Sequence, residues 1–102
     1  MEKLSVNGVV VAQKLLMSKM NEYNLPEYMC SGMSNYLLHH IQPGSFMTAV
    51  LSNDLRESVA CADETNSRLI KEWVMFLYNE APSDCWGSPE KVKNWLSKRE
   101  IE

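Results

Sequence analysis

The cysteine best placed for chemistry is Cys85, which stands between Asp84 and Trp86. A reactive thiol needs a nearby base or the N-terminus of a helix to lower its pKa. A helix that begins near Pro89 would lower the pKa of the thiol slightly through its dipole. The acidic and apolar neighbours would raise that pKa. We therefore predict a structural thiol in the joint between two helices. An enzyme that uses Cys85 or His39 is the weakest of three functional hypotheses.

The adjacent pair His39 and His40 is the second candidate, as metal ligands. Neighbouring residues of a helix point about 100° apart, so this pair cannot bind one metal ion as an i, i+4 pair does. Cys30, Cys61 and Cys85 are widely spaced and form no CxxC pair. We predict no metal site, three reduced thiols, and two histidines at the C-terminus of a helix.

Four carboxylates lie close together in the sequence: Asp54, Glu57, Asp63 and Glu64. Paired carboxylates can act as general acid and base when a pocket shifts the pKa of one of them. Their positions near expected helix starts favour capping and solvation instead. The sequence contains no glycine-rich phosphate loop, GxSxG or HExxH motif. We predict no catalytic residue and no cofactor.

Composition limits the class of protein. The chain has 102 residues, 45% of them hydrophobic, and a formal net charge of −3, which is typical of one small globular domain. No run of 18 apolar residues and no convincing signal-peptide cleavage site occur, so we expect a cytoplasmic protein without a membrane span. The basic residues are scattered, and the one mild cluster is Lys91, Lys93, Lys98 and Arg99. Contact with nucleic acid through this cluster is the second hypothesis.

Apolar residues recur at steps of three and four along most of the chain, which indicates helices. Prolines, glycines and capping residues divide the pattern. The expected fold is a single all-α domain, a compact bundle of five to six short helices over residues 8–23, 26–40, 45–62, 64–80 and from 88 onward, in which Ser52-Asn53-Asp54 can bend or interrupt the helix 45–62. Residues 4–12 also fit a hairpin around Asn7-Gly8, and this alternative to the first helix stays open.

The predicted helix 64–80 is apolar over more than half of its circumference, so we place it at the centre of the bundle. Trp73 within it, with Trp86 and Trp95, should anchor the fold, and Trp86 should fill the space where the last two helices meet. Three apolar residues lie off the main stripe of the first helix. We expect them to contact a partner or a second copy of the chain, as a homodimer: Val10, Val11 and Leu15.

Three segments resemble a group of small proteins encoded by tailed phages and prophages. They read PGSFMTAVLSNDL, ADETN and YNEAPSDCWGSPEKV, within residues 25–98. The first 24 residues fall outside the match. The resemblance implies the cytoplasm of a bacterial host, and it transfers no catalytic residue. It also implies a phage or prophage accessory protein that binds a host or phage protein, such as a component of a defence system. Protein–protein binding without catalysis is therefore the first hypothesis.

Overall fold

Side-chain caps define the starts of three helices. Asp54 accepts a hydrogen bond from the backbone N–H of Glu57 at 3.1 Å, and α4 (Leu55–Cys61) follows. Asp63 accepts from the N–H of Asn66 at 2.7 Å and starts α5 (Glu64–Ser67). Ser88 likewise precedes α7 (Pro89–Ser97), which has proline at its first position. These caps satisfy backbone donors that a helix leaves unpaired.

Left-handed residues follow three of the helices. Asn24 follows α1 (Val9–Glu22), His40 follows α2 (Glu27–His39), and Asn53 lies just beyond α3 (Ser45–Leu51), with φ of 62°, 58° and 63°. Asparagine and histidine tolerate this region better than most residues. After α1 and α3 the next N–H donates to a carbonyl five residues earlier, as in a Schellman motif.

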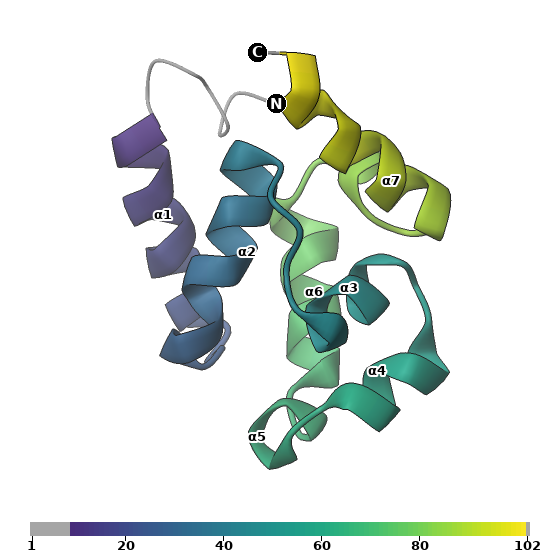
Figure 1. The fold of residues 1–102 in the computed structure, drawn as a ribbon. Helices are drawn as coiled ribbons and strands as arrows, with labels where there is room; N and C mark the ends of the chain where they lie inside the picture. Colours follow the sequence, from purple (N-terminus) through teal and green to yellow (C-terminus); the bar gives the residue numbers. More distant parts are fainter. Residues whose placement is uncertain (1–8, 102) are drawn as a thin grey trace.

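The structure, a computed structural model, describes residues 9–101, and within them every regular element is helical (Figure 1). The order is completed by α6 (Ile70–Glu80), the 3₁₀ turn η3 (Ser83–Cys85) and η4 (Lys98–Ile101). The all-α prediction is confirmed. The hairpin is wrong for residues 9–12, which belong to α1; residues 4–8 of that alternative lie outside the described part.

One predicted helix is divided. Residues 64–80 form α5 and α6, separated at Arg68 and Leu69, so the described chain has seven α-helices and not five to six. Leu69 leaves the helical region, with φ of −116° and ψ of 15°. A buried hydrogen bond spans the break. The buried Asn66 turns its Oδ1 toward the indole Nε1 of Trp73, which donates to it at 2.9 Å.

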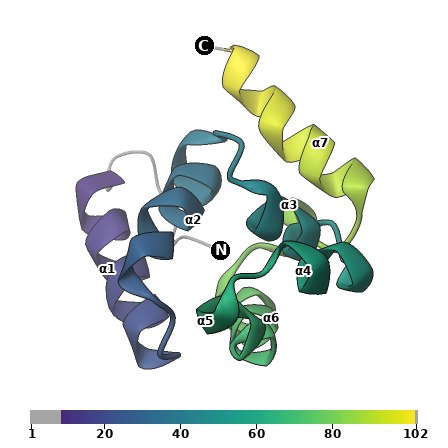
Figure 2. The same cartoon turned by 60° about the horizontal axis from the view of Figure 1, so that its bottom comes forward.

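The core lies between α2, α3 and α6. Its largest fully buried side chains include Trp73, Tyr36 and Phe76, and α1 adds Leu16 and Met20 to the same cluster. Figures 1 and 2 show α1 beside α2 at one side of the molecule and α7 at the other. The two ends of the described chain therefore cover opposite flanks of the core.

The connector after α6 is tied down by backbone groups. The N–H of Gly87 donates to the carbonyl of Leu51 at 2.7 Å, and the hydroxyl of Tyr36 donates to the carbonyl of Cys85 at 2.6 Å. Trp86 is half-buried and packs against the core. These bonds join the connector to α2 and α3, and α7 then starts in a fixed place.

Gly87 should be the least replaceable glycine of the described chain. Its φ of 117° is a conformation that side chains disfavour, although a Cβ there would meet only Lys91, at 3.7 Å. We expect Gly87→Ala to lower the free energy of unfolding by about 1–3 kcal/mol, as backbone strain alone. Urea denaturation monitored by circular dichroism measures this.

Gly32→Ala is the matched control. Gly32 lies inside α2, and nothing within 4 Å would meet an added Cβ. Alanine favours the helix by about 0.5–1 kcal/mol, so this variant should be more stable than the parent. Equal effects at the two glycines would contradict the strain argument.

Candidate functional site

Exposed apolar side chains gather on two neighbouring helices. Seven large hydrophobic residues within the described chain are exposed, and five of these belong to α4 and α6. Tyr78 is 73% exposed and Leu55 69% exposed. We call this surface the α4–α6 face and define it by five residues: Leu55, Val59, Val74, Met75 and Tyr78.

Helical geometry makes the α4–α6 face continuous. Val74 and Tyr78 are four residues apart, as are Leu55 and Val59, so each pair lies on one side of its helix. Leu55 and Val74 line the same small hollow of about 40 Å³ between the two helices. The two pairs are therefore neighbours on one surface, with some polar residues in the hollow between them.

The predicted central position of residues 70–80 is only half right. Trp73, Phe76 and Leu77 are buried, as expected for a core helix, while Val74 and Tyr78 on the other side are exposed. A helix that is apolar over most of its surface usually has neighbours all round. Here no described residue covers the outer side. The width of the apolar surface can be seen in the sequence. Which side of the helix stays exposed cannot.

The predicted contact residues of the first helix stay only partly described. Leu15 is 55% exposed on α1. The side chains of Val10 and Val11 lie outside the described part of the chain, although both residues belong to α1. Figures 1 and 2 place α1 and α4 at different sides of the molecule. Leu15 is therefore not brought to the α4–α6 face, and its role stays a prediction.

The three tryptophans differ in burial. Trp73 is 0% exposed and Trp95 is buried, whereas Trp86 is half-buried. The indole Nε1 of Trp95 donates to the carbonyl of Tyr36 at 2.8 Å. This bond joins α7 to α2, while the bond from Trp73 to Asn66 joins α6 to α5. Both polar ends are satisfied, as a buried indole requires.

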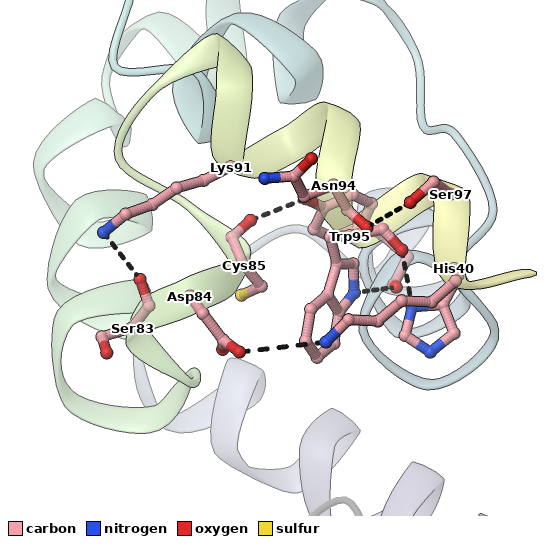
Figure 3. A network of polar contacts seen from close by, with 10 residues as sticks. His40, Ser83, Asp84, Cys85, Lys91, Asn94, Trp95 and Ser97 are labelled. Atoms are coloured by element: carbon pink, nitrogen blue, oxygen red, sulfur yellow. Dashed lines mark hydrogen bonds and ion pairs between the residues drawn. The ribbon is translucent and has the colours of Figure 1, made fainter.

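Trp95 is also the centre of a polar network at the end of α2 (Figure 3). His40 Nδ1 lies 2.9 Å from the carbonyl of Trp95, and the two rings are 4.7 Å apart. Burial raises the pKa of Tyr36 well above its usual range, with the neighbouring Cys85 as a second cause. The Tyr36 hydroxyl therefore stays protonated and donates to the Cys85 carbonyl. The network holds elements together, and His40 at its edge borders an open surface hollow.

The candidate nucleophile Cys85 is 0% exposed, so no substrate reaches its thiol in this structure. His39 is exposed at the end of α2. Among the described residues no group of three or more His, Cys, Asp or Glu side chains is placed to hold a metal ion. Asp54 and Asp63 act as helix caps, as predicted.

Asp63 also makes a contact across the fold. The hydroxyl of Tyr28 on α2 donates to its carboxylate. This hydrogen bond, with a second one from the N–H of Asn66, lowers the pKa of Asp63, and the carboxylate raises the pKa of Tyr28. Both side chains are exposed, so the pair links α2 to α5 at the surface. Such exposed bonds add little to stability.

The basic cluster does not form one face. Lys91 Nζ donates to the carbonyl of Ser83 at 3.1 Å, and Lys98 Nζ lies 4.4 Å from the centre of the Trp95 ring. Both point to the side of α7 that covers the connector. Lys93 is two residues from Lys91, hence about 160° away around the helix, and borders a different hollow. A nucleic-acid backbone along α7 would meet only part of this charge.

A hollow of about 570 Å³ lies between α3, α4 and the start of α7. Its lining mixes small polar residues with Asp54, Glu57 and Cys61. The Cys61 thiol points to Glu57 at 3.9 Å, and Asp54 is already engaged as a cap. Glu57 is the potential base recorded against this thiol, and no histidine is among the lining residues of the hollow.

No family model, curated protein or solved structure matches this chain. Within the described residues no helix has the length and apolar character needed to cross a bilayer.

Proposed function

We propose that this chain is a non-enzymatic protein-binding module and that the α4–α6 face is its contact surface. The supporting observation is the concentration of exposed apolar side chains on these two helices. Contiguous exposed apolar surface on a small soluble domain is typical of an interaction site. Aromatic and methionine side chains such as Tyr78 and Met75 are enriched at such interfaces.

The rigid support beneath the face favours binding without rearrangement. Trp73, Phe76 and Leu77 hold the inner side of α6 in the core, so its outer side chains are presented from a fixed helix. A preformed surface loses less conformational entropy on binding than a flexible one. The mechanism is occlusion, in which a helical surface covers a site on another protein.

The resemblance to phage and prophage proteins supports a setting. Under it, the partner is a host or phage protein in the cytoplasm of a bacterium, and a host defence protein is one such target. Leu55 and Tyr78 lie at the ends of two of the segments on which the resemblance depends. The alternative, contact with nucleic acid, has less support because Lys91 and Lys98 point to the connector side while Lys93 points away from it.

The test is affinity capture from infected or lysogenic bacteria with three forms of the full chain. The parent should capture a protein, and the double variant Leu55→Ser, Val59→Ser should lose it, because the two exposed large hydrophobic residues of α4 become polar. Leu15→Ser is the matched control, since Leu15 is similarly exposed on α1. Quantitative mass spectrometry compares the captured proteins, and circular dichroism confirms that each form is folded.

Loss of capture with Leu15→Ser but not with the α4 double variant would move the contact to the first helix. Capture that survives both changes would exclude apolar contact by α4 and by Leu15. If the parent chain retains a nucleic acid at about 50 mM salt, where phosphate contacts are strongest, the alternative function is favoured.

A further inference from the structure

We propose that the partner of α6 is a second copy of this chain, with two α6 helices paired antiparallel across a two-fold axis. This inference rests on the proposed function, because it assigns an occupant to part of the α4–α6 face. It leaves the exposed residues of α4 beside the pair and open to another protein.

The outward residues of α6 are arranged symmetrically along the helix. Opposite the buried side lie Lys71, Val74, Met75 and Tyr78, whose steps of three, one and three read the same in both directions. In an antiparallel pair residue 71 therefore meets residue 78 of the second copy, and residue 74 meets residue 75. A surface that meets itself in this way is what a two-fold interface requires.

The chemistry of these positions is self-complementary in that register. Lys71 would lie against the ring of Tyr78 in the second copy, an attractive cation–π contact that occurs twice. Val74 would pack against Met75, also twice. Lys71 is exposed and forms no ion pair within the described chain, so its charge is available. A parallel pair would instead place lysine on lysine, which is repulsive.

The size of the contact sets its strength. α6 has 11 residues, so the shared seam is about 16 Å long. One helix on each side buries less than the ~800 Å² per partner that stable complexes bury. We therefore expect a weak dimer with Kd in the micromolar range. Leu55 and Val59 on α4 lie beside this seam, so a dimer presents two copies of that pair.

Sedimentation equilibrium of the full chain, from about 1 µM to about 1 mM, tests this. The parent should shift from monomer to dimer across that range. Tyr78→Lys replaces both cation–π contacts by lysine pairs and should weaken the dimer at least about tenfold. The exchanged variant, Lys71→Tyr with Tyr78→Lys, restores both pairs and should dimerise within about threefold of the parent.

A parent that stays monomeric at about 1 mM overturns the proposal. So does an exchanged variant that is as weak as Tyr78→Lys, because the antiparallel register requires the rescue. The α4 double variant Leu55→Ser, Val59→Ser separates the two ideas. It should still dimerise while losing capture of another protein. If the parent is monomeric but captures a protein through α4, the dimer is contradicted and the proposed function is retained.

Discussion

Replacing Trp73 by alanine should lower the free energy of unfolding by about 3–5 kcal/mol, the usual cost of truncating a buried tryptophan. Trp73 is 0% exposed and stands edge-on to Phe76 at 6.5 Å. A domain of this size has about 5–15 kcal/mol in total, so the variant should be largely unfolded in mild urea. Chemical denaturation followed by tryptophan fluorescence and circular dichroism measures the change.

The indole bond to Asn66 can be separated from this packing effect. Trp73→Phe leaves the buried amide of Asn66 without its donor, and Asn66→Ala leaves the indole N–H without its acceptor. Each should cost about 1–3 kcal/mol, and the double variant should cost less than the sum. Trp86→Phe is the control, because Trp86 is only half-buried. Strict additivity would show that the bond does not hold α5 to α6.

Tyr36→Ala is the second large effect, also about 3–5 kcal/mol, because the ring is fully buried between α2 and α7. Tyr36→Phe isolates the hydroxyl. It leaves the Cys85 carbonyl unpaired in the core and should cost about 1–3 kcal/mol. Tyr28→Phe is the matched control, since the hydroxyl of Tyr28 is bonded at the surface. Its effect should be small in the same denaturation experiment.

Tyr36 also gives a pH dependence with a definite sign. Its pKa is raised in the folded state, chiefly by burial. The unfolded chain therefore loses this proton first, at about pH 10, and the contribution of Tyr36 to stability falls as the pH rises beyond that value. Tyr36→Phe should flatten the decline in the free energy of unfolding above about pH 10. An unchanged slope would contradict the assignment.

Local chemistry explains what the sequence predicted well. The caps Asp63 and Ser88 and the breaks near Pro26 and Pro43 depend on residues a few positions apart, and each appears in the structure. Such signals need no knowledge of the rest of the chain. The all-α class follows from them together with the apolar spacing.

Two features depended on distant parts of the fold. The break at Arg68 and Leu69 is spanned by the hydrogen bond between Asn66 and Trp73, a contact that periodicity does not reveal. The α4–α6 face likewise depends on which side of α6 the other helices leave uncovered. An apolar residue such as Val74 reads the same in sequence whether it is buried or exposed, so the candidate site required the structure.

The bond from Trp95 to the Tyr36 carbonyl has a consequence for how the protein is made. Residues 36 and 95 are joined directly, and the Gly87 amide is held by Leu51. A nascent chain on the ribosome can form α1 and α2 early and pack them together, but α7, which contacts α2 through Trp95, emerges last. The core is therefore complete only after Trp95 has left the exit tunnel, and shorter nascent chains leave part of it exposed to chaperones and proteases.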